Sequence, residues 1–146
     1  MSDFRTLNDT VLASPQITLE DVAIAKAQGV SLIVNNRPEG ESADQTPGDA
    51  IEAAARAAGM EYLAIPITHA GFSLPQVDAL VQALGEADGK VLAYCRSGTR
   101  STLLWALARA KAGDAPEAIA AAAAEAGYDV SPVRPTIDML AGRASG

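Results

Sequence analysis

Residues 90–101 read Lys-Val-Leu-Ala-Tyr-Cys-Arg-Ser-Gly-Thr-Arg-Ser, and this stretch decides the fold. Its first five residues form a short apolar run of the kind that builds a buried parallel strand. Gly98 then marks a turn, and apolar residues at helical spacing follow from about Ser101. The stretch therefore predicts a strand, a tight loop and a helix, with the loop at the carboxyl end of the strand.

The alternation of strand and helix continues on both sides of this stretch. Thr18 or Ser14 can cap a first helix, and Ser73 with Gln76 has the pattern of a capping box. We expect one domain over residues 1–146 with an α/β fold, a three-layer sandwich around a mainly parallel sheet of four to five strands. The further expected elements are helices at 18–28, 47–58, 73–84 and 114–126, strands at 30–34 and 62–67, and a short helix at 137–140 before a flexible tail from about 142.

Composition excludes several classes of protein. The 146 residues carry 18 acidic and 11 basic side chains, a net charge of −7, which argues against a nucleic-acid partner. One Cys and one His cannot build a Cys/His zinc cage, and no metal or organic cofactor is implied. No apolar run approaches the length of a membrane span and no secretion signal opens the chain, so we expect a cytoplasmic protein without a membrane partner. Its oligomeric state stays open.

The loop after residues 90–94 combines groups that stabilise an anion beside a thiolate. Successive backbone N–H groups at a helix N-terminus form an anion cradle, and Gly98 permits a backbone angle that other residues resist. Arg96 and Arg100 add permanent positive charge. The same surroundings favour the thiolate form of Cys95, which is the nucleophilic form. Cys95 and Arg100 are therefore the predicted catalytic residues.

The remaining candidate residues are predicted to bind substrate. Ser101 can donate to the sulfur or cap the helix, and His69 lies on a loop that follows a strand end, where it can act as an acid or a hydrogen-bond donor. Arg37, together with Glu39 and Glu41, can line the same face, or Arg37 makes a structural contact with Glu41. Tyr94 contributes a hydroxyl or packs, whereas Trp105 is expected in the core. The full predicted binding set is Arg37, His69, Arg96, Ser97, Gly98, Thr99 and Ser101.

The active-site segment resembles that of rhodanese-type sulfurtransferases. Their loop follows the pattern Cys-Arg-x-Gly-x-Arg/Thr, and residues 95–100 match every specified position. This resemblance implies that Cys95 takes a sulfur atom from thiosulfate or a persulfide, holds it as a persulfide and passes it to a thiol acceptor. Such a transfer needs no general acid, because the leaving group departs without a proton.

The chain as a whole more closely resembles the bacterial beta-lactamase-hydrolase-like family of candidate phosphatases. The supporting segments are residues 34–41, residues 64–67 and residues 94–101, in that order. The resemblance implies a tyrosine-phosphatase-like fold. Relatives can be fused to a persulfide dioxygenase-like domain, which implies sulfide metabolism and makes a persulfide dioxygenase a candidate partner.

Two departures from the tyrosine phosphatase signature weigh against phosphatase activity. That signature places five residues between Cys and Arg and usually a His before the Cys, whereas four residues separate Cys95 from Arg100 and Tyr94 replaces the His. Phosphatases of that type also use an Asp general acid, but the loop at 68–73 has no carboxylate and Asp78 falls on the next helix.

The sequence therefore favours a rhodanese-like sulfurtransferase, with a small-molecule sulfur donor and a thiol acceptor as partners. The alternative is a phosphatase that acts through a Cys95 phosphocysteine. A second alternative is a non-catalytic module that binds an anion or senses oxidation through Cys95.

Overall fold

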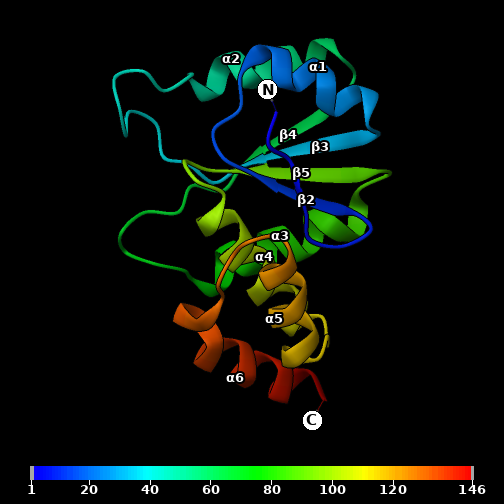
Figure 1. Ribbon diagram of the computed structural model, residues 1–146, viewed down its shortest axis with the longest axis vertical. Coiled ribbons are helices and arrows are strands. Elements are labelled where there is room, and N and C mark those ends of the chain that lie inside the picture. Colours follow the sequence, from blue (N-terminus) through cyan, green and yellow to red (C-terminus); the bar gives the residue numbers. More distant parts are fainter. Residues whose placement is uncertain (1, 146) are drawn as a thin grey trace.

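The computed structural model describes residues 2–145, which form a five-stranded sheet between two layers of helices (Figure 1). The strand order is β1-β2-β5-β3-β4, with β1 antiparallel to β2 and every other pair parallel. This arrangement confirms the expected three-layer α/β fold. The strands are β1 (Arg5–Thr6), β2 (Val11–Ser14), β3 (Val30–Asn35), β4 (Glu61–Ala64) and β5 (Lys90–Tyr94).

Strand β5 lies at the centre of the sheet and decides where the site is. Tyr94, its last residue, is level with Ser14 at the end of β2 and with Asn35 at the end of β3. Cys95 therefore leaves the sheet where three carboxyl strand ends meet, which is the edge at which open α/β sheets bind ligands. The predicted strand at 90–94 is confirmed.

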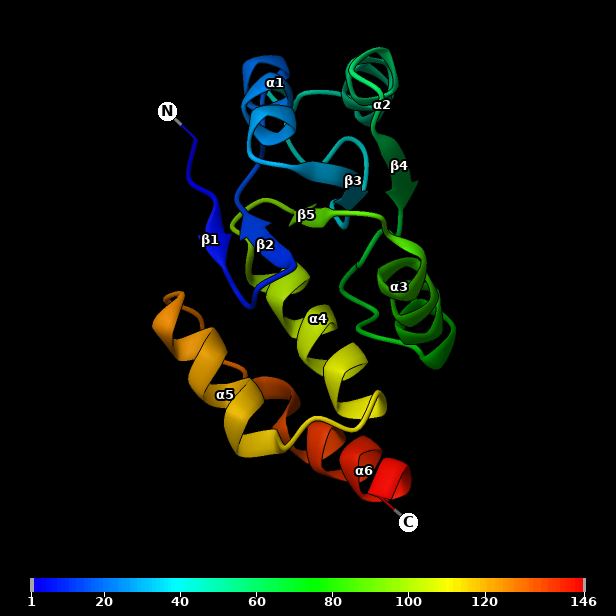
Figure 2. The ribbon, with the colours of Figure 1, turned by 90° about the vertical axis from the view of Figure 1, so that its right-hand side faces the viewer.

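The helices divide between the two faces of the sheet (Figures 1 and 2). Helices α1 and α2 cover one face, and the other four cover the opposite face. The residues of β5 alternate between the two cores: Leu92 and Tyr94 pack toward the first face, Val91 and Ala93 toward the second. The helices are α1 (Leu19–Ala27), α2 (Gly48–Ala57), α3 (Leu74–Glu86), α4 (Thr99–Lys111), α5 (Pro116–Glu125) and α6 (Arg134–Ser145), with a 3-10 turn at Ser131–Val133.

Helix α4 is the central helix of the second face and follows the site loop directly. Nine of its 13 residues are buried, including Trp105 at 2% exposure, which confirms that this side chain belongs to the core. A helix buried on nearly all sides cannot shift without disturbing its neighbours. The first turn of α4 is therefore a rigid platform for the residues it carries.

Two helices begin as the capping patterns predict. The Thr18 hydroxyl accepts from the Asp21 N–H, and the Asp21 carboxylate accepts from the Thr18 N–H. Ser73 and Gln76 form the same reciprocal pair at the start of α3. Thr18, not Ser14, is thus the cap of α1, because Ser14 ends β2 instead.

Several elements differ from the sequence prediction, including β4, which spans Glu61–Ala64 and not residues 62–67. Strands β1 and β2 were not expected, because two and four residues are too few to show a periodic pattern. Helix α5 starts at Pro116 because the Asp114 carboxylate accepts two hydrogen bonds from Arg109 instead of capping the helix. Helix α6 spans 12 residues, not the four expected. No helix among residues 2–145 is long and apolar enough to cross a membrane.

Candidate active site

The loop between β5 and α4 wraps the sulfur of Cys95. The Gly98 N–H donates to Cys95 Sγ at 3.1 Å, and Gly98 is also the N-cap of α4. Cys95 has no exposed surface. The sulfur therefore lies at the N-terminus of a 13-residue helix, where unpaired N–H groups and the helix dipole favour a negative charge.

Gly98 is required by two independent features of the loop. Its φ of +92° lies in the left-handed region, which costs residues with a Cβ about 1–2 kcal/mol. A Cβ at this position would also lie 2.1 Å from Tyr128 Oη, far inside contact distance. The prediction that Gly98 adopts a backbone angle that other residues resist is confirmed.

Tyr128 holds the outer side of the loop and was not among the residues predicted for the site. Its hydroxyl donates to the Ser97 carbonyl at 3.2 Å from the turn after α5. The guanidinium of Arg5 lies over the Tyr128 ring, 5.3 Å from its centroid, and Arg5 Nη1 donates to the Ala126 carbonyl. Arg5, near the N-terminus, thus packs against Tyr128 in the turn after α5, and Tyr128 supports Ser97 of the loop.

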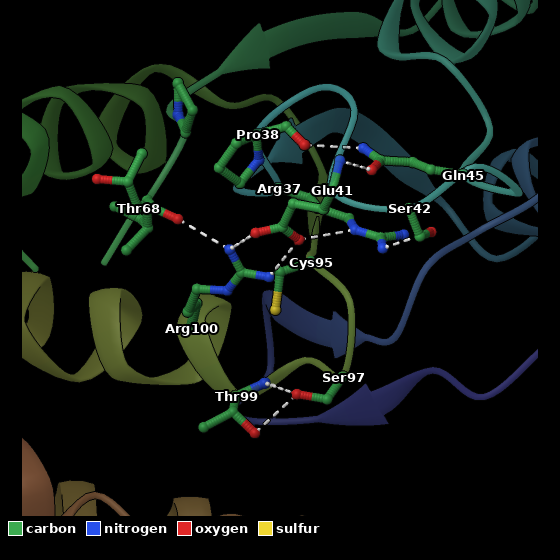
Figure 3. A network of polar contacts seen from close by, with 12 residues as sticks. Arg37, Pro38, Glu41, Ser42, Gln45, Thr68, Cys95, Ser97, Thr99 and Arg100 are labelled. Atoms are coloured by element: carbon green, nitrogen blue, oxygen red, sulfur yellow. Dashed lines mark hydrogen bonds and ion pairs between the residues drawn. The ribbon is translucent and has the colours of Figure 1, made fainter. Parts of the chain in front are cut away.

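Arg100 projects from the first turn of α4 into a fixed set of acceptors (Figure 3). Its Nη1 donates to Glu41 Oε2 at 2.7 Å and to the Ile67 carbonyl at 2.8 Å. Its Nη2 donates to Glu41 Oε1 at 2.8 Å, which completes a two-bond pair between guanidinium and carboxylate. The orientation of Arg100 is therefore set by a loop after β3 and by the segment after β4.

Arg37 reaches the other side of the same carboxylate (Figure 3). Its Nε donates to Glu41 Oε1 at 2.9 Å, and its two remaining nitrogens donate to Gln16 and Ser42. At 4% exposure Arg37 is buried, so the structure shows the contact with Glu41 and not a side chain that lines the open surface. Hydrogen bonds from Arg100 and then Arg37 lower the pKa of Glu41 from 4.5 to about 2.

Ser101 contacts Asn36 and not the sulfur. Its hydroxyl donates to Asn36 Oδ1 at 2.8 Å, and both side chains are buried. Asn36 in turn donates through Nδ2 to the Ile65 carbonyl at 2.9 Å. The expected bond from Ser101 to Cys95 is thus replaced by a bond that links α4 to the ends of β3 and β4, because the hydroxyl finds a stronger acceptor there.

The other loop residues lie at the surface. Ser97 Oγ donates to Thr99 Oγ1 at 3.0 Å and accepts from the Thr99 N–H at 3.3 Å. Arg96 is exposed, and among the described residues no carboxylate forms an ion pair with it.

Tyr94 is 1% exposed in the core under α1 and α2, where burial raises the pKa of its hydroxyl, so this side chain packs.

A cavity of about 580 Å³ opens beside this loop. It brings Arg96, Arg100 and His69 together, as the sequence predicted, and of the three residues Arg37, Glu39 and Glu41 that were candidates for this face it includes Glu41. The residues that line it are Pro38, Glu41, Thr68, His69, Arg96 and Arg100. Within residues 2–145, no group of three or more His, Cys, Asp and Glu side chains could hold a metal ion.

A family model places the chain among known proteins. The phosphatase-like domain of beta-lactamase hydrolase-like proteins matches residues 3–112, which hold every strand and the whole site. The chain belongs to this family. The resemblance expected from the sequence is thereby confirmed, and this phosphatase-like domain can be compared with its relatives.

One curated relative is a beta-lactamase hydrolase-like protein of Xylella fastidiosa. It is 34% identical over 101 residues, which is 69% of this chain and 23% of the relative. A relative of the same description in Agrobacterium fabrum is 35% identical over 107 residues, 73% of this chain and 25% of its own length. The phosphatase-like domain thus spans about a quarter of the curated relatives it matches.

The solved structures point to phosphatases. A candidate phosphatase of Neisseria meningitidis superposes with a TM-score of 0.82 at 31% identity, over 94% of this chain and 98% of that one. The structure of PTPMT1 shares the fold, with a TM-score of 0.71 at 18% identity over 97% and 98% of the two chains. The phosphatase-like domain therefore has a tyrosine-phosphatase-like fold.

These findings overturn the sulfurtransferase prediction. The family is described as phosphatase-like. The Neisseria meningitidis protein, which shares 31% sequence identity and the fold, is a candidate phosphatase. The prediction went wrong because the pattern Cys-Arg-x-Gly-x-Arg was weighed above the fold, although an anion cradle at a helix N-terminus serves either chemistry. The alternative stated with it, a cysteine-dependent phosphatase, is the function that the comparisons support.

Proposed function

We propose that this domain is a cysteine-dependent phosphatase in which Cys95 is the nucleophile. The observation that carries the proposal is the sulfur held at the N-terminus of α4, with the Gly98 N–H at 3.1 Å and Arg100 in the first helical turn. A thiolate in this position is held by the loop, and the cavity lined by Arg96 and Arg100 opens beside that loop. A thiolate next to fixed positive charge suits attack on a phosphoryl group.

Arg100 keeps one edge of its guanidinium for the substrate. Of the five N–H donors that a guanidinium carries, both on Nη1 and one on Nη2 are taken by Glu41 and the Ile67 carbonyl. The Nε–H and the second Nη2–H form the remaining edge. Two parallel donors of this kind match two oxygens of a phosphoryl group. We assign Arg100 to binding the phosphoryl oxygens in the transition state.

The loop supplies the rest of the charge stabilisation. Backbone N–H groups from Arg96 to Ser101 precede and begin α4, where the Gly98 N–H donates to the sulfur and the helix N-terminus has no intrahelical acceptors for its first N–H groups. Donors fixed in advance are worth more to a developing charge than water, because they need not reorganise. Arg96, exposed on the same loop, adds a positive charge that draws an anionic ester toward the cavity.

The reaction proceeds in two displacements. The Cys95 thiolate attacks phosphorus, so that a S–P bond forms while the P–O bond to the leaving group breaks. Water then attacks the phosphocysteine, the S–P bond breaks and inorganic phosphate leaves with the thiolate restored. Because the nucleophile is a reduced thiol, we place this activity in a reducing compartment such as the cytoplasm.

The direct test is phosphate release from p-nitrophenyl phosphate, with intact-protein mass spectrometry of acid-quenched samples. We expect a gain of one phosphoryl group on the parent protein and none on Cys95→Ser, which should also lose turnover. Arg100→Lys should lower kcat/KM by about 100-fold, since a single ammonium cannot replace the two-donor edge. Arg134→Lys on α6, whose guanidinium binds Glu117 and Asp138, is the matched control and should leave turnover unchanged. Turnover that survives in Cys95→Ser would refute the proposal.

A further inference from the structure

The leaving oxygen of an alkyl phosphate needs a proton, and the cavity beside the loop limits which side chain can supply it. Proton transfer to the leaving group by a positioned side chain typically accelerates such reactions about 10²–10⁴-fold. The side chains that line the cavity belong to Pro38, Glu41, Thr68, His69, Arg96 and Arg100. Of these, Pro38 has no proton to give, and a threonine hydroxyl or a guanidinium is too weak an acid near neutral pH.

Glu41 is excluded by its contacts. Both carboxylate oxygens accept hydrogen bonds from Arg100, and Oε1 also accepts from Arg37. Two guanidinium groups around one carboxylate hold it in the charged form, so it carries no proton at neutral pH. Glu41 therefore positions Arg100 and cannot act as the acid.

The carboxylates closest in sequence to the lining residues are engaged outside the cavity, and Glu39, which does not line it, accepts a hydrogen bond from the Gly48 N–H at 2.9 Å. Asp78 lies on α3 in an ion pair with Lys111 of α4. Asp44 accepts a hydrogen bond from the Ser42 hydroxyl at 2.7 Å, within the loop between β3 and α2. Neither side chain lines the cavity. The position that an Asp general acid would occupy is thus without a carboxylate.

His69 lies on the wall of the cavity in a fixed turn. The Thr68 carbonyl accepts from the Gly71 N–H at 3.0 Å, and the Thr68 hydroxyl accepts from the Ala70 N–H at 3.2 Å. Gln76 Nε2 donates to the Pro66 carbonyl and ties the same segment to α3. His69 is exposed at the tip of this turn, and within residues 2–145 no hydrogen bond or ion pair engages its ring.

We infer that the imidazolium of His69 is the general acid for the leaving group. The inference rests on the proposed phosphatase activity. When the S–P bond forms, the breaking P–O bond leaves its electron pair on oxygen, and a ring nitrogen of His69 gives that oxygen its proton. The neutral ring then accepts a proton from the water that attacks the phosphocysteine, which restores the imidazolium. The charged groups that share the cavity with the ring are Arg96, Arg100 and Glu41.

The test compares two leaving groups in the parent, His69→Gln and Asp78→Asn proteins. With a phenyl or alkyl phosphate, whose leaving oxygen needs a proton, we expect His69→Gln to lower kcat by about 100-fold. With an aryl phosphate whose phenol is acidic, such as p-nitrophenyl phosphate, the loss should be less than about threefold. Asp78→Asn should match the parent with both substrates.

The outcomes distinguish a failure of the role inferred for His69 from a failure of the proposed phosphatase activity. An equal loss on both substrates would mean that His69 acts through binding or structure, and no loss on either would also overturn the inference. A loss confined to Asp78→Asn would move the role to that carboxylate. If the parent released no phosphate from any ester, the proposed function would fail and this inference with it. Release by the parent together with an unchanged His69→Gln profile would overturn the inference alone.

Discussion

Glu41 and Arg100 lie 59 positions apart in the sequence and are joined by two hydrogen bonds of 2.7 and 2.8 Å. The pair connects the loop after β3 to the first turn of α4, and a third bond from Arg37 holds the carboxylate from behind. Because the pair uses only one edge of the guanidinium, it fixes Arg100 without occupying the edge left for substrate. In the proposed phosphatase, substrate binding and the stability of the domain are thus linked through one carboxylate.

Glu41→Gln should weaken both properties. The change leaves the buried Arg37 without its charged partner, and hydrogen bonds to charged groups are each worth about 1.5–3 kcal/mol. We expect the free energy of unfolding to fall by about 2 kcal/mol in urea titrations. Glu52→Gln, in an exposed pair with Arg56 on α2, is the control and should change it by less than about 0.5 kcal/mol. Equal losses in the two variants would show that the Glu41 cluster is no stronger than a surface pair.

The same carboxylate makes stability depend on acid pH. The pKa of Glu41 falls from its ordinary 4.5 to about 2 on folding, so the unfolded chain binds more protons between these values. The contribution of Glu41 is therefore complete above about pH 5 and is lost as the pH falls toward 2. We expect the stability difference between the parent and Glu41→Gln to shrink when urea titrations are run at pH 6, 4 and 3. A difference that is constant over this range would contradict the assignment.

Gly98→Ala should separate backbone strain from steric clash. Gly113 also has positive φ, but a Cβ there would meet no atom within 4 Å, so Gly113→Ala measures the strain alone at about 1–2 kcal/mol. Gly98→Ala should cost more, because its Cβ would meet Tyr128 Oη. The excess should disappear in the background of Tyr128→Ala, as a double-mutant cycle in urea would show. If the excess persisted there, the clash with Tyr128 would not be its cause.

Ser101→Ala should act through Asn36. Without the hydroxyl, buried Asn36 Oδ1 loses its donor, which costs about 1–3 kcal/mol. The cost should be smaller in the background of Asn36→Ala, because the acceptor is already absent. Thr99→Ala, two residues earlier and exposed, should change the free energy of unfolding by less than about 0.5 kcal/mol. Additive losses for Ser101 and Asn36 would mean that the bond between them does not matter.

The parts of the fold that were predicted are those encoded by local patterns. The run at 90–94, the turn at Gly98, the cap at Thr18 and the capping box at Ser73 each specify structure within a few residues, and each is confirmed. Strand β2 was missed because its four residues gain their stability from pairing with β5, a partner distant in sequence.

The site was predicted less completely for the same reason. Cys95 and Arg100 belong to one continuous motif, so their proximity could be read from the sequence. Glu41 was a candidate for the same face, and it lies there because parallel strands β3 and β5 end at the same edge of the sheet. Tyr128 follows a helix that is two connections away from the loop, and no local pattern links it to Ser97. Contacts of this kind depend on the packing of α5 against α4, which periodicity does not specify.

Because Cys95 is completely buried, the rate at which its thiol is labelled reports on opening of the loop around it. Cys95 is the only cysteine of the chain, so any thiol-reactive probe reports on this one sulfur. A bulky maleimide can reach a sulfur without exposed surface only during an excursion in which the loop or its neighbours open. The labelling rate of the native protein, divided by that of the unfolded chain, therefore measures how often the site opens. Ligands that fill the cavity should lower the labelling rate of Cys95, and variants that loosen the Tyr128 contact should raise it.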